Sequence, residues 1–124
     1  MDDTTIMQGA GLEIAVGRSE ASTTVRLKGR VDIDSSPELR ERLLTLLKTR
    51  TYGVVIVDLN EVPYIDTSGV ATLIEALKIG RLRTNRLCLQ GLTGSVLHFF
   101  EVTGVLTLFN ASECSGASPA PKES

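Results

Sequence analysis

The sequence is poor in the residues on which most enzyme active sites depend. Its 124 residues include one histidine, two cysteines and no tryptophan. The single histidine, His98, lies between apolar neighbours on a predicted helix and leaves no second imidazole for a Ser-His-Asp or Cys-His arrangement. Neither of the two glycine-rich nucleotide-binding fingerprints is present. We therefore expect a protein that is not an enzyme and needs no cofactor, although the sequence leaves open whether it binds a nucleotide.

The chain also lacks an excess of charge of either sign and a long apolar run. Thirteen basic and fifteen acidic residues give a net charge of −2 at pH 7. Without a basic cluster, we expect no nucleic-acid partner. The longest strongly aliphatic run covers residues 54–57, far short of the roughly 20 residues that a membrane-spanning helix needs. The acidic start does not resemble a secretory signal, so we expect a cytoplasmic protein without membrane insertion.

Cysteine usage gives little evidence for a structural cross-link. Cys88 lies in an apolar segment and Cys114 in a polar tail, without the paired spacing of a metal site. We interpret both as free thiols in a reducing compartment, and we expect no bound metal.

Hydrophobic periodicity predicts one α/β domain. Strands are predicted at residues 12–16, 23–28, 53–58, 86–90 and 106–109, and helices at 36–50, after Asp66, and at 93–103. The first two strands form an antiparallel hairpin at one edge, and the β-branched run at 53–58 is a central strand covered on both faces. The predicted order is β-β-α-β-α-β-α-β, a mixed sheet that is parallel except at the N-terminal edge hairpin, with about three to four helices. Residues 1–10 are expected to be a flexible arm, 11–110 the folded domain, and 111–124 a disordered tail.

An acidic residue ends the predicted central strand, at a position where open α/β sheets place ligands. This residue, Asp58, is in the position of the phospho-accepting aspartate of receiver domains. Gly17 and Arg18 follow the first strand where a receiver has an acidic pair, and no lysine ends the strand at 86–90. We therefore interpret Asp58 as an acid that bonds nearby backbone amides.

The segment 62–70 carries the most information about function. Asp66 is a predicted N-cap, which places Thr67 and Ser68 in the first turn of a helix, and Gly69 allows close approach of another backbone or a protein partner. Two hydroxyls at the positive end of a helix dipole make a place where a phosphate is tolerated. Spacing alone favours the simpler interpretation, in which these residues only cap the helix.

The segment 66–70, Asp-Thr-Ser-Gly-Val, after a β-branched strand that ends in Asp58-Leu59, resembles the signature of the STAS domain of bacterial anti-sigma factor antagonists. Residues 27–32 resemble the family's segment before the first helix, and residues 100–105 resemble its end-of-helix pattern. Together the matched pieces span residues 12–109 in the family order, which implies a STAS-like fold.

The resemblance implies a phosphorylation switch. Unphosphorylated members bind a serine-kinase anti-sigma factor of the GHKL-ATPase type, which frees the sigma factor. The kinase then phosphorylates the serine that corresponds to Ser68, and a metal-dependent serine phosphatase restores binding. Thr67 stands where many members have serine, so it is a second candidate acceptor.

We expect the partner to contact the exposed face of the same helix, at Ser68, Thr72 and Glu75. The alternative is that Thr72 and Glu75 are ordinary solvated helix positions. The full set of expected partner-binding residues is Asp32, Tyr64, Asp66, Thr67, Gly69, Thr72 and Glu75.

A different function is also consistent with the resemblance. Free-standing STAS domains serve as subunits of lipid-transport ABC systems or as stressosome-like scaffolds that act by packing against partner proteins. The presence of Ser68, a residue that accepts phosphate, favours the switch. An enzyme of flavodoxin type is disfavoured, and the sequence indicates neither the particular sigma factor nor an oligomeric state.

Overall fold

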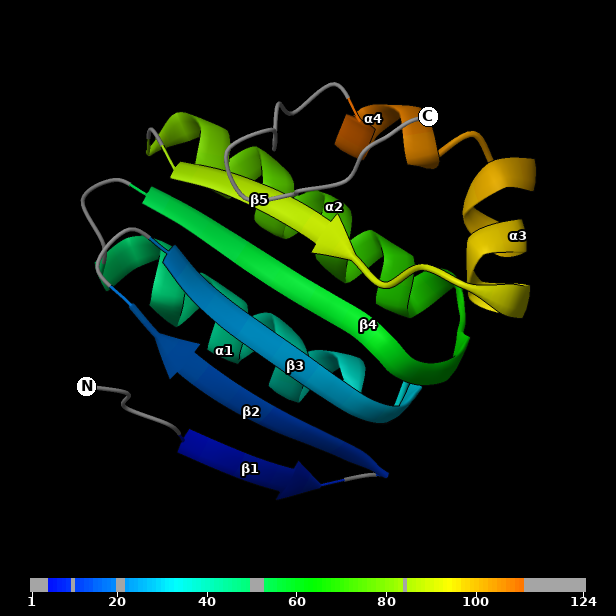
Figure 1. The fold of residues 1–124 in the computed structure, drawn as a ribbon, viewed down its shortest axis with the longest axis horizontal. Helices are drawn as coiled ribbons and strands as arrows, with labels where there is room; N and C mark the ends of the chain where they lie inside the picture. The colour runs from blue at the N-terminus through cyan, green and yellow to red at the C-terminus, as the bar shows by residue number, and fades with distance from the viewer. Residues whose placement is uncertain (1–4, 10, 20–21, 50–52, 84, 111–124) are drawn as a thin grey trace.

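The computed structural model describes residues 5–9, 11–19, 22–49, 53–83 and 85–110. Within them the chain forms one five-stranded sheet in the order β1-β2-β3-β4-β5 (Figure 1). The strands are β1 (Thr5–Gly9), β2 (Leu12–Arg18), β3 (Ser22–Val31), β4 (Gly53–Ile65) and β5 (Asn85–Gln90). The helices are α1 (Ser36–Thr49), α2 (Thr67–Leu82), α3 (Gly94–Val102) and α4 (Leu106–Asn110).

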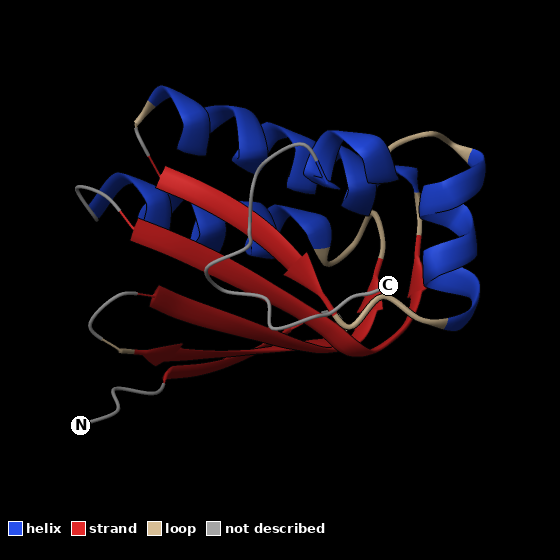
Figure 2. Cartoon of the chain, turned by 45° about the horizontal axis from the view of Figure 1, so that its top comes forward, coloured by secondary structure: helices blue, strands red, loops and turns tan. Residues whose placement is uncertain are grey.

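Strand direction changes once across the sheet. The pairs β1–β2 and β2–β3 are antiparallel, whereas β3–β4 and β4–β5 are parallel. The helices α1 and α2 connect the parallel strands and lie on the same side of the sheet (Figure 2). Because each helix returns the chain to the start of the next parallel strand, α1 and α2 run in the same direction as one another. This mixed α/β architecture confirms the predicted fold class.

The core lies between this side of the sheet and the two long helices. The four leucines that predict an apolar face on α1 are all at most 1% exposed, and they are Leu39, Leu43, Leu46 and Leu47. They pack in one cluster with alternate residues of β2, β3 and β4. Full burial stabilises each such side chain by about 1.5–3 kcal/mol relative to exposure, so this face holds α1 against the sheet.

The N-terminal edge of the sheet differs from the prediction. The hairpin of β2 and β3 is present, but β1 pairs with the outer side of β2 and forms the edge itself. Residues 5–9, expected in a flexible arm, are therefore a strand. The segment is short and has no alternation of apolar and polar residues. Its pairing with β2 is made by backbone hydrogen bonds, which no side-chain pattern reveals. Residues 1–4 and 10 lie outside the described residues.

The predicted last strand at 106–109 is wrong, because these residues form the short helix α4. Gly104 has φ +77°, a left-handed conformation that ends α3 and turns the chain. The Phe109 side chain is then buried, with its ring centroid 6.2 Å from that of Phe100. Val105 and Leu106 also pack against the core, so tertiary packing decides a segment too short for periodicity to assign. The expected tail at 111–124 lies outside the described residues.

The prediction that β4 is a central strand covered on both faces is confirmed. β4 lies between β3 and β5, and both Ile56 and Val57, which point to opposite faces, are buried.

Cys88 in β5 is disulfide-bonded, so the free thiol predicted there is wrong, and the argument for a reducing compartment loses this support. Cys114 lies outside the described residues. No helix in the described part of the chain is long and apolar enough to cross a membrane.

Asp58 does not end its strand, because β4 continues to Ile65. Its Oδ1 accepts a hydrogen bond of 2.9 Å from the Asn60 amide. The interpretation of Asp58 as an acid that bonds nearby backbone amides is confirmed.

Candidate functional site

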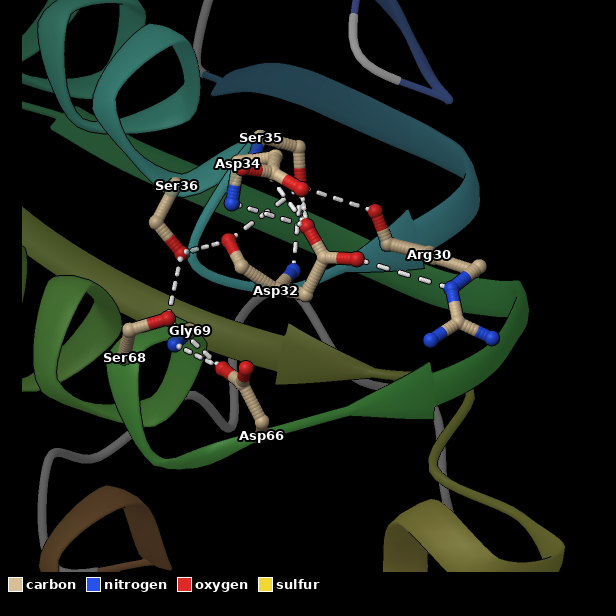
Figure 3. A network of polar contacts seen from close by, with 8 residues as sticks. All are labelled: Arg30, Asp32, Asp34, Ser35, Ser36, Asp66, Ser68 and Gly69. Atoms are coloured by element: carbon tan, nitrogen blue, oxygen red, sulfur yellow. Dashed lines mark hydrogen bonds and ion pairs between the residues drawn. The ribbon is translucent and has the colours of Figure 1, made fainter.

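The site forms where β3 and β4 end side by side. The two strands are parallel, and their last residues, Val31 and Ile65, are register partners. The helices that follow therefore begin next to each other. The hydroxyl oxygens of Ser36 in α1 and Ser68 in α2 lie 3.2 Å apart (Figure 3).

The Ser68 hydroxyl has a defined orientation. It donates a hydrogen bond of 2.6 Å to Asp66 Oδ1, and Ser36 donates one of 2.6 Å to the Asp32 carbonyl oxygen. Each serine has a single hydroxyl proton, so both protons are used in these shorter bonds. The Ser68 oxygen therefore presents lone pairs toward Ser36, and its proton points to a carboxylate.

Asp66 is the N-cap of α2, as predicted. Its Oδ1 accepts a hydrogen bond of 3.1 Å from the Gly69 amide. Partial burial raises the pKa of Asp66, but hydrogen bonds from the Ser68 hydroxyl and from backbone amides of Gly69, Ser68 and Ile33 outweigh it and lower the pKa below its ordinary value. A negative charge is thus held next to the Ser68 hydroxyl at the start of α2.

Gly69 is enclosed by the protein's own strands. An added Cβ would lie 2.6 Å from Val31 Cγ1, 2.7 Å from Ile65 Cγ1 and 3.1 Å from the Val31 carbonyl oxygen. The predicted close approach of another backbone is confirmed, and β3 makes it. Gly69 is buried, so it offers no surface to a protein partner.

The α2 face that carries Ser68, Thr72 and Glu75 faces α1, so the expectation of an exposed strip is wrong at Thr72, whereas the Glu75 side chain is 42% exposed. The Thr72 side chain is only 7% exposed. Glu75 forms two hydrogen bonds of 2.7 Å with the Arg40 guanidinium of α1. This pair of hydrogen bonds raises the pKa of Arg40. It also lowers the pKa of Glu75, mainly through the hydrogen bonds and to a smaller extent through the opposite charge of Arg40. The neighbouring helix limits the exposure of this face, which helical spacing alone does not reveal.

The residues of α2 that are exposed to solvent lie on an adjacent face. They are Thr67, Ala71, Lys78, Arg81 and Leu82. Thr67, one of the two candidate phosphate acceptors, is therefore more open to solvent than Ser68, which is half-buried.

A groove of about 710 Å³ runs between α1 and α2, with Ser68 in its wall. Ile33, which is 71% exposed, is one of the residues that line it. The other lining residues are Ser36, Pro37, Arg40, Glu41, Leu44, Thr45, Lys48, Ala71 and Thr72. Ser68 is thus reachable from outside the protein, with apolar and charged side chains beside it.

Asp32 and Tyr64 lie at this end of the sheet, as expected. Asp32 Oδ1 accepts hydrogen bonds of 3.0 and 3.2 Å from the amides of Asp34 and Ser35, which shapes the turn before α1 (Figure 3). The Arg30 guanidinium lies 3.5 Å from Asp32 Oδ2 and 4.4 Å from the centre of the Tyr64 ring. Arg30 therefore links the two residues, and Tyr64 remains 41% exposed.

Sequence reasoning missed the roles of Ser36 and Arg40. Ser36 is the first residue of α1, where the predicted helix also begins, and its hydroxyl donates a hydrogen bond to the Asp32 carbonyl oxygen. The predicted βαβα order contained part of the signal, because two helices that follow adjacent parallel strands and cover the same face of the sheet start side by side.

The described residues include no cluster of three or more His, Cys, Asp or Glu side chains that could hold a metal ion. His98 is exposed on α3.

Comparison with known proteins shows consistent similarities. The family profile described as "Mlab, STAS domain" matches residues 14–109. The anti-sigma-B factor antagonist of Listeria monocytogenes is 30% identical over 88 residues, which cover 71% of this chain and 76% of that protein. An anti-sigma factor antagonist from Mycobacterium paratuberculosis has a similar structure, with a TM-score of 0.65 at 16% identity over 79% of this chain and 82% of that chain.

Similarity extends to the anti-sigma factor antagonist SpoIIAA, of Bacillus. Its unphosphorylated form gives a TM-score of 0.58 at 15% identity, over 80% of this chain and 82% of that chain. Its phosphorylated form gives 0.57 at 14% identity, over 85% and 86%. At these identities the likeness concerns the fold.

Proposed function

This chain belongs to the STAS domain family, among its anti-sigma factor antagonists, and we propose that it acts as a phosphorylation-controlled partner of an anti-sigma factor. With a free Ser68 hydroxyl it binds a serine-kinase anti-sigma factor of the GHKL-ATPase type, and the sigma factor is released. The kinase transfers phosphate to Ser68 and the complex dissociates. A serine phosphatase removes the phosphate and restores binding. Since the donor is ATP, we assign the cycle to the cytoplasm.

The observation that carries this proposal is the setting of the Ser68 hydroxyl. It is fixed at the start of α2 by a hydrogen bond of 2.6 Å to Asp66, and it lines an open groove. A kinase can therefore reach a hydroxyl that the helix cap holds in a defined orientation. Thr67 is exposed one residue earlier and remains the second candidate acceptor.

Phosphorylation at this position should preserve the fold. A phosphoserine adds about −1.5 to −2 charges at pH 7. A negative charge at a helix N-terminus is favourable by roughly 0.3–1 kcal/mol, which argues against unfolding of α2. The effect of the phosphate must then fall on the interface with the partner.

The interface gives a sufficient reason for release. Asp66 already contributes one negative charge beside the acceptor, so the phosphate concentrates negative charge on a surface that docked as a neutral hydroxyl. A loss of about 2.7 kcal/mol weakens binding a hundredfold. The corrected docking surface consists of the groove and the exposed side chains around Ser68, in particular Ile33, Tyr64 and Thr67.

Mass spectrometry tests the proposal directly. Incubation of the full chain with its partner kinase and ATP should add one phosphate, which peptide mapping assigns to Ser68. The variant Ser68→Ala should remain unmodified, and Thr67→Ala should be modified like the parent. A phosphate on neither residue contradicts the mechanism.

Complex formation with the partner, measured with and without ATP, separates the alternative function. A STAS subunit of a lipid-transport ABC system, or a stressosome-like scaffold, would act by packing alone. Its complex would form with Ser68→Ala as with the parent chain and would not respond to ATP through Ser68.

A further inference from the structure

We propose that Arg40 is a phosphate-binding residue, which leaves Glu75 and pairs with the phosphate when Ser68 is phosphorylated. The inference deepens the proposed function and rests on it for the source of the phosphate. It assigns a part in the switch to a residue of α1, the helix that does not carry the acceptor.

The two helices place Arg40 between the acceptor and its present partner. Their starts are aligned by the 3.2 Å contact of Ser36 with Ser68, and the helices run in the same direction. Arg40 lies four residues after Ser36, which puts it level with Thr72. By helix rise, Ser68 lies about 6 Å before this level and Glu75 about 4.5 Å beyond it. Arg40, Ser68 and Thr72 line the same groove.

The direction of the side chains favours the exchange. Helical side chains lean toward the N-terminus of their helix, so the stem of Arg40 leans toward the start of α1 and Ser36. Residues four apart on a helix bring their side chains within ion-pair reach. A phosphate on Ser68, next to Ser36, therefore lies within the range of the Arg40 guanidinium.

The present pair is open to solvent and easily rearranged. The Arg40 and Glu75 side chains are 51% and 42% exposed. Exposed ion pairs of this kind contribute little to stability, because water solvates the separated charges well. The pair thus holds the guanidinium near the groove without locking it there.

The phosphate is the stronger competitor for the guanidinium. It carries up to two negative charges and offers three acceptor oxygens, which match the arginine fork better than one carboxylate does. Esterification also removes the proton that Ser68 donates to Asp66, so the Asp66 carboxylate repels the phosphate. The phosphate is therefore driven toward the groove, where Arg40 supplies the compensating charge.

Among the described residues that line the groove, only Arg40 and Lys48 are cationic. Lys48 lies two helical turns beyond Arg40, about 12 Å farther from the start of α1. It has the same charge and shares the groove, so it makes a matched control.

The exchange would alter the docking surface well beyond the modified serine. Glu75 would lose its partner and present an uncompensated carboxylate two turns along α2. Binding of a partner that contacts the groove would then respond to charge at both positions.

The experiment uses the full chain with phosphoserine installed at position 68 during synthesis, without any kinase. Phosphorus NMR follows the second ionisation of the phosphate against pH. A nearby guanidinium stabilises the phosphate dianion and so lowers the pKa of the second phosphate ionisation. We therefore expect this phosphate pKa to be about half a unit higher in Arg40→Gln than in the parent. Lys48→Gln should leave it unchanged. Glu75→Gln, which removes the competing carboxylate, should lower it.

A parent and an Arg40→Gln protein with the same phosphate pKa would overturn the proposal, as would an equal shift in Lys48→Gln. A second measurement needs no variant: the Arg40 Nε–Hε resonance should move when Ser68 carries phosphate, and an unmoved resonance contradicts the exchange. Since the phosphate is installed synthetically, a negative result leaves the kinase reaction untouched. Mass spectrometry after the kinase reaction tests that step separately.

Discussion

The hydroxyl oxygens of Ser36 and Ser68 lie 3.2 Å apart, although the residues are 32 positions apart in the sequence. The contact exists because β3 and β4 are parallel neighbours and each passes its chain to a helix at the same end of the sheet. The N-terminal ends of two helices therefore form the surface around Ser68, and a chemical change at Ser68 affects residues of α1 as well as of α2.

The cap of α2 should contribute measurably to stability. Asp66→Ala removes the acceptor of the Gly69 amide and of the Ser68 hydroxyl, and we expect a loss of about 1 kcal/mol in the free energy of unfolding. Asp66→Asn keeps a capping oxygen and should lose much less. Urea denaturation of both variants measures the difference, and equal stabilities would show that the cap contributes nothing.

The same residue gives the fold a pH dependence with a defined sign. The pKa of Asp66 is lower in the folded protein than its ordinary value of 3.8. The stabilisation is therefore complete above that value and is lost as pH falls through the lower, folded-state pKa. Thermal melts of the parent and Asp66→Asn between pH 6 and 2 should converge at the acid end, and a constant difference in stability would contradict this account.

Gly69 should resist substitution for lack of space. In Gly69→Ala the new methyl would lie 2.6 Å from Val31 Cγ1 and 2.7 Å from Ile65 Cγ1. Overpacking of this kind costs about 1–3 kcal/mol. Gly17→Ala is the control, because nothing lies within 4 Å of an added Cβ there. If chemical denaturation gave the two variants the same stability, the tight contact of α2 with β3 and β4 would be refuted.

Phe109 should contribute most of the packing that holds the helix α4 in place. Phe109 is 4% exposed and packs near Phe100, whereas its neighbour Leu108 is 43% exposed. We expect Phe109→Ala to cost about 3–5 kcal/mol, as for other buried phenylalanines. Leu108→Ala should cost far less. Thermal unfolding compares them, and a larger loss for Leu108→Ala would instead favour a strand with the opposite face buried.

Local sequence signals were enough for the elements that carry strong periodicity. The α1 leucines and the Asp66 cap are recognisable because each follows from residues within a few positions of one another. The strand β1 and the helix α4 are five residues each, too short for a period to be read. Pairing and packing with distant segments decide such elements.

The candidate site shows the same division. The position of Ser68 in the first turn of a helix was predictable from Asp66 and the strand before it. That Thr72 is buried and Glu75 is paired with Arg40 was not, because both facts depend on which face α1 covers. Whether a helix position is exposed or buried depends on the segments that pack against the helix. The spacing of residues within one helix carries no information about those segments.

The most direct test of the central claim is the affinity of the partner kinase for this chain before and after incubation with ATP. Isothermal titration calorimetry should show about a hundredfold weaker binding of the phosphorylated parent, corresponding to about 2.7 kcal/mol. Ser68→Ala should bind as tightly after ATP as before. Loss of Ser68→Ala binding after ATP to the same extent as the parent would contradict the account, because release would then not depend on the Ser68 hydroxyl.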